Sequence, residues 1–358
     1  MTHARRALAI IDLQALRHNL QRVRRAAPAS KVMAVVKADG YGHGLVRVAR
    51  QLDADAYAVA CLDEALALRE AGIQRPIVLL EGFSEPQELE PIRRYSLDAV
   101  VHHRAQLDIL EHAGASPIKV WLKIDSGMHR LGFPPEEVPD AWRRANACAA
   151  AAKPLRFMTH LANADARGDA RTARQLEVFH QALGGRAGER SIANSAAILA
   201  WPQSHVEWVR PGLMLYGASP FIGGRAEQEG LQPVMTLGTR LIAVNAVKKG
   251  EAVGYGGTWV CPRDMRIGVA AIGYGDGYPR HAANGTPVLV NGRRTALVGR
   301  VSMDMVCVDL SEQPEARIGD PVVLWGKELP VEEVAQHAAT IPYELLCGVT
   351  RRVAFCEV

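Results

Sequence analysis

Short apolar runs alternate with longer amphipathic stretches through about the first 230 residues, and this alternation limits the folds that the chain can adopt. The runs are rich in β-branched residues, as buried strands are, and lie near 32–36, 56–60, 77–80, 98–101, 118–124, 155–159, 191–193 and 206–209. The intervening stretches have a helical spacing of apolar residues and include 62–70, 85–94, 105–112, 136–152 and 171–183. Strands that alternate with helices pair in parallel, and about eight such units are typical of a barrel. The sequence therefore predicts an α/β chain that opens with a (β/α)8 TIM-like barrel.

Polar or ionisable residues follow nearly every predicted strand. They are Lys37, Glu81, His102, Asp125, His160, Asn194, Ser195 and Arg210. In a (β/α)8 barrel the functional groups lie at the carboxyl ends of the strands. A barrel with only a structural role would not require this arrangement, so the pattern predicts an enzyme.

The pattern changes after residue 220. Residues 220–224 are typical of a linker, and from 233 onward short β-branched runs lie between Gly, Pro and Asn residues. Asn291-Gly292 is a hairpin signal, and one short helix is predicted near 331–338. We therefore expect two domains, a barrel over residues 1–230 and a mainly β domain over 231–358, with the first 11 or so residues pairing with the β domain.

Lys37 lies at the end of the first predicted barrel strand, directly before a glycine-rich loop. A lysine at a dry strand end can lose its proton and attack a carbonyl carbon. Taken alone, it is better explained as a surface lysine that closes a strand. The decision depends on the groups that accompany it at the mouth of the predicted barrel.

Three of these groups form a candidate phosphate site. Ser195 is placed to cap a short helix, Gly212 exposes backbone N–H groups, and Arg210 follows an apolar run. Each has a structural explanation when taken alone, as a simple helix cap or a surface ion pair. Together with a strand-end lysine they indicate pyridoxal 5'-phosphate (PLP) held as a Schiff base.

Several motifs then establish a resemblance. The stretch 34–44, AVVKADGYGHG, resembles the PLP-lysine signature of the alanine racemases. Further motifs similar to those of this family are KIDSGMHRLGF at 123–133, VRPGLMLYG at 209–217, GYGGTW at 254–259, GYGDGYPR at 273–280, GRVSMD at 299–304 and IPYE at 341–344. They occur in the family's order and cover essentially the whole chain.

The resemblance implies a role for each matching residue. Lys37 carries PLP and is the base on one face of the substrate, and Tyr255 of the partner subunit is the base on the other face. The cofactor-binding residues are Lys37, Tyr41, His160, Ser195, Arg210, Gly212, Leu213 and Tyr343. The substrate-binding residues are Arg130, Met303 and Asp304, and the last two reach across from the other subunit. Lys123 is carbamylated in many family members and then orients Arg130.

This assignment agrees with the chemistry of racemisation. Two bases on opposite faces can remove and return the Cα proton directly, and PLP makes that proton acidic. A tyrosine is a poor base at its ordinary pKa of about 10, so nearby cations or donors must lower it. Arg210, which the resemblance places opposite the pyridine nitrogen, keeps its proton, and we expect it to make the ring a weaker electron sink than a carboxylate partner would.

Other functions remain open at this stage. A PLP-homeostasis protein has the barrel and lysine but lacks a β domain, and a decarboxylase of the same fold type places a carboxylate where Arg210 stands. A broad-specificity or serine racemase is a closer alternative. Gly275 departs from the family, which usually carries Ala at that position. No metal site is predicted, since His102-His103 has no acidic or cysteine partner at a ligand spacing.

Composition adds limits. The net charge of +4 and the short Lys/Arg runs without interleaved aromatic residues do not suggest nucleic-acid binding. No span approaches transmembrane length, and the initial apolar run is too short for a signal peptide. Six cysteines without a C-x-x-C pair fit a reducing cytoplasm. The expected protein is a cytoplasmic homodimer that acts on alanine and belongs to D-alanine biosynthesis, which supplies a peptidoglycan precursor.

Overall fold

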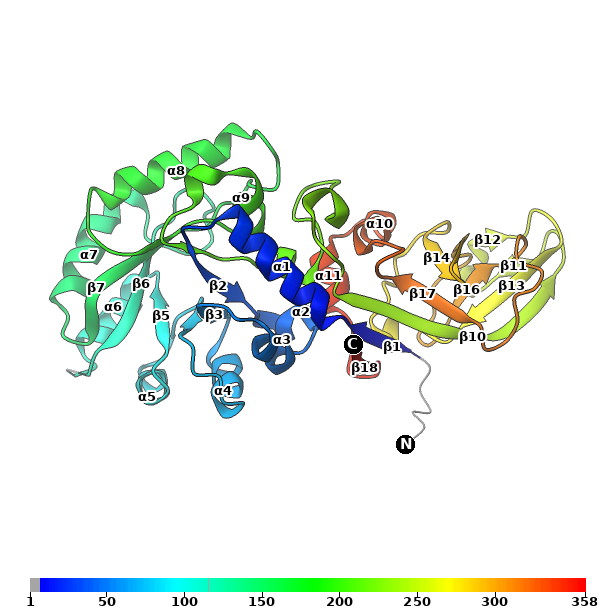
Figure 1. Cartoon of the computed structure of the whole chain (residues 1–358), viewed down its shortest axis with the longest axis horizontal. Coiled ribbons are helices and arrows are strands. Elements are labelled where there is room, and N and C mark those ends of the chain that lie inside the picture. Colours follow the sequence, from blue (N-terminus) through cyan, green and yellow to red (C-terminus); the bar gives the residue numbers. More distant parts are fainter. Residues whose placement is uncertain (1–6, 115) are drawn as a thin grey trace. The chain divides into compact units, whose positions relative to one another are not determined.

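The computed structural model describes residues 7–114 and 116–358 (Figure 1). The chain divides into two compact units. The barrel unit comprises Asn19–Leu215 and Pro220–Ile222, and the remaining described residues form the β unit. Residues 12–18, 216–219 and 223–230 therefore lie in the β unit, whereas the sequence places them with the barrel. No helix of the described residues is long and apolar enough to cross a membrane.

Eight parallel strands close into a barrel, which confirms the predicted fold class. The strands are β2 (Lys31–Val35), β3 (Ala56–Val59), β4 (Ile77–Leu79), β5 (Asp98–Val101), β6 (Ile118–Lys123), β7 (Ala151–Met158), β8 (Arg190–Ser191) and β9 (Trp208–Val209). The barrel closes where Lys31 and Val32 of β2 pair with Trp208 and Val209 of β9. Because both faces of such a strand are covered, the strands appear in the sequence as continuous apolar runs.

Helices connect consecutive barrel strands (Figure 1). They are α2 (Lys37–Gly42), α3 (Leu45–Gln51), α4 (Leu62–Glu70), α5 (Leu89–Arg94), α6 (Arg104–Glu111), α7 (Val138–Ala147), α8 (Ala170–Leu183) and α9 (Ser195–Ala200), while α1 (Leu13–Ala26) precedes the first barrel strand. The helix predicted over 136–152 is too long by five residues, since α7 ends at Ala147. Ala151 and Ala152 instead begin β7, because they pair with Ile118 and Lys119 of β6.

A chain of ion pairs lies near the starts of the barrel strands and extends from the buried Asp98 to the exposed Lys31. Arg156 Nη1 donates to Asp98 Oδ2 at 2.6 Å, and Arg156 Nε lies 2.9 Å from Glu189 Oε2. Lys31 Nζ reaches the other oxygen of Glu189 at 2.8 Å. The Asp98 side chain is 3% exposed, so its charge depends on Arg156. This end of the barrel is thus internally neutralised.

The β unit is built on an eight-stranded sheet. Its strands run in the order β15 (Arg293–Ala296), β14 (Pro287–Val290), β17 (Pro321–Trp325), β10 (Met235–Val247), β1 (Leu8–Ile11) and β18 (Ala354–Glu357), while β13 (Met265–Ala270) pairs with β10 and with β16 (Val306–Asp309). The first strand, β1, lies antiparallel to β10 and parallel to β18. A short separate ladder joins β11 (Ala252–Val253) to β12 (Trp259–Val260).

The predicted hairpin and helix are both present in the β unit. Asn291 and Gly292 have φ of 50° and 73° and join β14 to β15, as a two-residue turn with left-handed central residues requires. The helix predicted near 331–338 is α10 (Val331–His337). A further helix, α11 (Pro342–Cys347), was not predicted from the sequence.

Candidate active site

Four of the predicted site residues lie directly after barrel strands or at their ends. Lys37 comes two residues after β2, Lys123 ends β6, His160 comes two residues after β7, and Arg210 follows β9. The carboxyl ends of parallel strands meet at one mouth of a barrel. The barrel unit therefore brings these four side chains to the same mouth.

The mouth is strongly cationic. Burial, followed by the charges of Arg210 and Arg130, lowers the pKa of Lys123 to about 8. Burial and the same arginines, together with Lys123 and Lys37, hold the pKa of His160 well below its ordinary value. Such mutual repulsion costs stability unless an anion is present. The charge of the mouth therefore favours an anionic ligand.

Arg210 is held rigidly by acceptors at the mouth. Its Nη1 donates to the Ser191 hydroxyl at 2.6 Å, and its Nη2 donates to the carbonyls of Thr159 at 2.5 Å and Ile192 at 3.2 Å. His160 Nδ1 lies 3.5 Å from the same Nη2. Burial lowers the pKa of Arg210 to about 10, so the group is charged at neutral pH. Both Nη atoms are used by the protein, and among the described residues Nε has no acceptor, so it is free for a ligand.

The backbone after Lys37 forms a left-handed helical turn. Ala38, Asp39, Gly40 and Tyr41 have φ of 53°, 52°, 62° and 52°. Only Gly40 adopts this conformation without a steric penalty, and each of the other three residues costs about 1–2 kcal/mol. Strain of this kind persists only where surrounding contacts over-determine it, and it is concentrated at functional sites.

The turn places Tyr41 against Gly212. A Cβ added to Gly212 would lie 2.6 Å from the Tyr41 hydroxyl, so only glycine leaves room for this contact. The Gly212 N–H donates to the Ser195 hydroxyl at 2.9 Å, and the Met214 N–H donates to it at 3.3 Å. Leu213 is buried beside them. Hydroxyls, backbone amides and nearby cations are a donor set that fits the phosphate of PLP.

The helix-cap interpretation of Ser195 is wrong. Asn194 caps α9, since its side chain accepts from the Ala197 N–H at 3.1 Å. Ser195 is the first helical residue, and its hydroxyl turns toward the loop that follows β9. The sequence favoured either residue, because Asn and Ser are equally good caps.

Arg130 lies on a loop organised by Asp125. One oxygen of Asp125 accepts from the backbone N–H groups of Gly127, Met128 and His129 at 3.0, 3.1 and 3.0 Å. The charge of Asp125 acts against the lowering of the Lys123 pKa, but burial and the two arginines outweigh it. Arg130 itself is exposed, and within the described chain no residue forms a hydrogen bond or ion pair with it. Its guanidinium is available to a carboxylate or phenolic oxygen.

The other four predicted residues lie in the β unit. Tyr255 stands on a turn between β11 and β12 and is 71% exposed, and Met303 is 52% exposed. Asp304 accepts from Arg352 Nη2 at 2.5 Å. Tyr343 is the second residue of α11. All four residues therefore belong to the β unit, whereas the other predicted site residues belong to the barrel unit.

Arg352 explains the glycine at position 275. A Cβ there would lie 2.2 Å from Arg352 Nη1, so an alanine would displace the guanidinium. In its present position Arg352 also lies 3.3 Å from Asp276 Oδ1. The departure of Gly275 from the family motif thus makes room for an ion-pair cluster that holds Asp304.

Several contributing residues were missed from the sequence. Thr159 and Ser191 orient Arg210, and Glu64 accepts from the N–H of Ala38 at 2.7 Å. His43 is buried and hydrogen-bonded to the left-handed turn. Among these residues, only His43 could have been suspected from the sequence, because it lies within the glycine-rich stretch that follows Lys37. His102 and His103 have local bonds instead, to the Glu81 carbonyl and to the Ala105 N–H.

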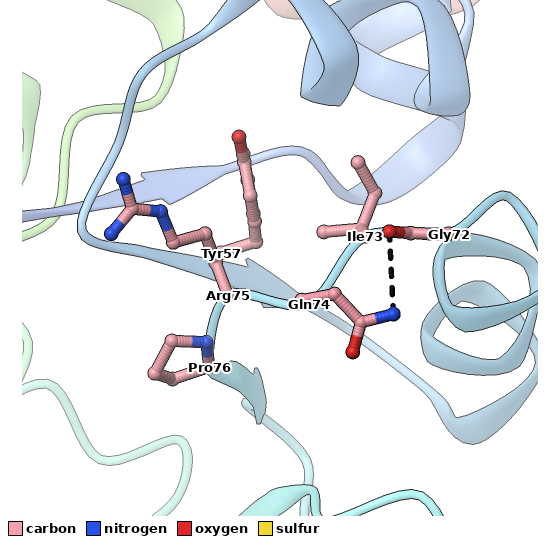
Figure 2. Close-up of a pocket in the computed structure, with 6 residues that line it drawn as sticks. All are labelled: Tyr57, Gly72, Ile73, Gln74, Arg75 and Pro76. Carbon is pink, nitrogen blue, oxygen red and sulfur yellow. Dashed lines mark hydrogen bonds between the residues drawn. The ribbon is translucent and has the colours of Figure 1, made fainter.

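A pocket elsewhere in the barrel unit contains none of the predicted residues. Figure 2 shows its lining, which is Tyr57, Gly72, Ile73, Gln74, Arg75 and Pro76. Pro76 directly precedes β4 and Tyr57 lies near the start of β3, so the pocket is at the amino ends of the strands. The active mouth of a barrel is at the carboxyl ends, and we assign no function to this pocket.

The fold and the mouth together define a class. It is a (β/α)8 barrel with an added β unit, whose lysine, arginines and phosphate-type cradle suit a phosphorylated carbonyl cofactor. Comparison with known proteins then identifies the family. The family model for the N-terminal domain of alanine racemase matches residues 11–220, and the model for the C-terminal domain of alanine racemase matches residues 234–356.

Full-length relatives agree. An alanine racemase of Nitrosococcus oceani is 59% identical over 96% of this chain and 97% of its own length. A biosynthetic alanine racemase of Escherichia coli O6:H1 is 53% identical over 97% and 98% of the two chains. The crystal structure of the biosynthetic alanine racemase of Pseudomonas aeruginosa has a TM-score of 0.96 at 47% identity and covers 99% of both chains.

The chain belongs to the alanine racemase family, whose members are PLP-dependent isomerases. The resemblance drawn from the motifs is confirmed, and so are the predicted enzyme class, function and cofactor. The roles of individual residues and the assembly stay predictions.

Proposed function

We propose that the chain interconverts L-alanine and D-alanine with PLP, and that Lys37 and Tyr255 of the partner subunit are the two opposed bases. The observation that supports the proposal most directly is the cationic mouth, in which a strand-end lysine stands beside a phosphate-type cradle. When bound, PLP supplies the electron-withdrawing ring that makes the Cα proton of the amino acid acidic.

The barrel residues hold the cofactor at its two ends. Tyr41, Ser195, Gly212 and Leu213 would bind the phosphate, and the resemblance to the family assigns the same role to Tyr343. Arg210 directs Nε toward the pyridine nitrogen, since both of its Nη atoms are used by protein acceptors. A guanidinium donates there without giving up its proton, which limits charge delocalisation into the ring and disfavours transamination and decarboxylation. His160, whose pKa is held well below its ordinary value by burial and by the surrounding cations, would pack against the ring.

Arg130 binds the substrate, and Lys123 orients Arg130. The exposed guanidinium of Arg130 donates to no acceptor among the described residues and would bind the substrate carboxylate and the phenolic oxygen. Lys123, whose pKa is lowered to about 8, has an appreciable neutral fraction near neutral pH. The neutral amine adds to carbon dioxide with release of a proton, and the resulting carbamate replaces a repulsive cation with an anion that attracts Arg130.

The second base requires a second copy of the chain. Tyr255 is 71% exposed on its turn, as expected of a side chain that completes a site elsewhere. We infer a homodimer in which Tyr255, Met303 and Asp304 of one copy complete the barrel mouth of the other. The two units then divide the work, the barrel domain over about 1–230 holding the cofactor and the β domain over about 231–358 supplying the second base. Six free cysteines support a reducing, cytoplasmic location.

One experiment tests the reaction. The protein is incubated with PLP and L-alanine in deuterated water, and optical rotation and Cα deuteration are followed together. Loss of rotation with deuterium at Cα is expected, and bound PLP without exchange would contradict the proposal. A parallel incubation with L-serine measures how far the site discriminates against a larger side chain.

A mixing experiment tests the composite site. Lys37→Ala and Tyr255→Phe each remove one base, so each pure variant is expected to be inactive. After the two variants are unfolded and refolded together, half of the dimers are mixed and each has one intact site, which gives about a quarter of the wild-type activity. No recovery on mixing, with dimers demonstrated, would show that the two bases belong to the same copy.

A further inference from the structure

His43 stands at the centre of the contacts that hold the left-handed turn. Its Nδ1 lies 2.8 Å from the Tyr41 carbonyl oxygen and 3.1 Å from the Gly40 carbonyl oxygen. Carbonyl oxygens only accept, so Nδ1 carries the proton and donates to both. The side chain is fully buried and its pKa is lowered to about 4 by burial, so the ring is neutral at working pH.

The rest of the turn is fixed at both ends. Glu64 accepts from the Ala38 N–H at 2.7 Å and from the Ala60 N–H at 2.8 Å, which ties the start of the turn to the end of β3. Asp39 Oδ1 accepts from the Leu45 N–H at 2.7 Å, which ties the turn to α3. Of His43, Glu64 and Asp39, only the imidazole of His43 forms a hydrogen bond to Tyr41, whose hydroxyl is proposed to bind the phosphate.

The position of that hydroxyl matters to within a fraction of an ångström. Tyr41 approaches Gly212 so closely that no Cβ fits between them, and Gly212 is also the residue whose N–H bonds Ser195. A small rotation of the strained turn would therefore move Tyr41 out of the cradle.

We propose that His43 is a positioning residue, which locks the left-handed turn through its bonds to Gly40 and Tyr41 and so sets the Tyr41 hydroxyl for the phosphate of PLP. The inference rests on the proposed role of Tyr41 in phosphate binding. His43 touches neither the cofactor nor the substrate, and it acts through the backbone of the turn.

The test compares two variants that differ in the hydrogen-bond donor. His43→Asn keeps an N–H donor on the atom that corresponds to Nδ1, and His43→Leu keeps the bulk without the donor. Phe179→Leu, a change at a fully buried position on α8, is the control for general loss of stability. PLP affinity is measured for the full chain by the absorbance of the lysine-bound cofactor, and pyridoxal without phosphate is titrated in parallel.

We expect His43→Leu to bind PLP about tenfold or more weakly, because two hydrogen bonds to the turn are lost. We expect pyridoxal affinity to change by less than about threefold, since pyridoxal does not use the cradle. His43→Asn should recover most of the PLP affinity. Phe179→Leu should lower the melting temperature of the apoprotein and leave PLP affinity unchanged.

A double-mutant cycle separates positioning of Tyr41 from general loosening. Tyr41→Phe removes the phosphate contact, so adding His43→Leu to it should cost much less affinity than adding it to the wild type. Equal costs in both backgrounds, or equal weakening of PLP and pyridoxal, would overturn the proposal. If His43→Leu does not fold, a His43→Asn variant that has wild-type stability but binds PLP tenfold or more weakly would overturn it as well. Failure of the proposed function is distinguishable, because it would appear in the unvaried chain as PLP binding without exchange.

Discussion

The Tyr41 hydroxyl occupies the space that a side chain at position 212 would need, 2.6 Å from the ideal Cβ position of Gly212. These residues come from opposite ends of the barrel sequence, one after β2 and one after β9, and the closure of the barrel makes their loops neighbours. The contact also puts the Gly212 amide and the Ser195 hydroxyl beside the same point. A phosphate at that point would be reached by donors from three separate loops.

Gly212→Ala is therefore expected to weaken PLP binding without preventing folding. The new methyl group pushes Tyr41 away from the cradle, and a misplaced charge-assisted donor costs about 1.5–3 kcal/mol, or roughly ten- to a hundredfold in affinity. Titration of apoprotein with PLP measures the loss. In the Gly212→Ala, Tyr41→Phe double variant the missing hydroxyl relieves part of the clash, so the second change should cost less than it does alone. Additive losses would argue that the two side chains do not compete for the same space.

Gly275→Ala is expected to release Asp304. The added Cβ displaces the Arg352 guanidinium, and with it the ion pairs to Asp276 and Asp304. The pair with Asp304 is exposed and contributes less than about 1 kcal/mol to the free energy of unfolding, whereas loss of the pair with the buried Asp276 adds to this cost. If Asp304 acts on the substrate in the partner's site, KM for alanine should rise more than kcat falls.

Arg352→Leu gives the matched comparison for that prediction. It breaks the same pairs without adding a methyl group at position 275, so it should change KM in the same direction. An Arg352→Leu variant with wild-type kinetics would show that the guanidinium is not what holds Asp304 in a useful position.

Stability in acid should depend on His43. Its pKa is about 4 in the folded protein against 6.5 for an unperturbed histidine, so between these pH values the unfolded chain binds a proton that the folded chain does not. The free energy of unfolding is therefore unaffected above pH 6.5 and decreases as the pH falls from 6.5 to 4, by about 3 kcal/mol in full. Urea unfolding is measured at several pH values for wild type and His43→Asn. His160 is present in both proteins, so its contribution cancels in the difference between their free energies of unfolding and that of His43 remains. Parallel curves would contradict the assignment.

The barrel was predictable because its strands and the residues at their ends can be recognised from short stretches of sequence. Strands buried on both faces are continuous apolar runs, and the residues after them mark the mouth, which is how Lys37, His160 and Arg210 were found. Strands β8 and β9 are only two residues long, and their existence depends on the closure of the barrel rather than on their composition. The β unit was less predictable, because β1 and β18 are local runs whose pairing depends on a partner far along the chain.

The left-handed turn could not be predicted from propensities. The three glycines at 40, 42 and 44 indicated a loop, but Ala38, Asp39 and Tyr41 adopt positive φ against their own preference. The contacts that enforce this, from Glu64 and His43, are tertiary or depend on the turn itself. The roles of Asn194 and Ser195 were exchanged for a similar reason, since propensity does not distinguish two good caps that stand side by side.

Arg156 is expected to be essential to the stability of the barrel. Arg156→Leu would leave the buried Asp98 carboxylate without its partner, at a cost of about 3–5 kcal/mol. Denaturant unfolding measures the loss. Adding Asp98→Leu removes the stranded charge and should recover much of the stability, because replacing both members of a buried pair with apolar residues is often nearly neutral. A double variant no more stable than Arg156→Leu would mean that the cost arises from packing rather than from the uncompensated charge.

Lys123 is expected to carry a carbamate that can be seen directly. Its pKa of about 8, lowered by burial and by Arg210 and Arg130, keeps part of the amine neutral and nucleophilic at pH values where an exposed lysine is fully protonated. In 13C-labelled bicarbonate the full-length protein should show a carbamate resonance that Lys123→Gln lacks. Because only the neutral amine reacts, the signal should grow as the pH rises through 8 and fade as it falls below. Absence of the resonance at pH 9 in saturating bicarbonate would leave Arg130 without an anionic partner on the barrel, and its orientation would then have to come from the substrate carboxylate alone.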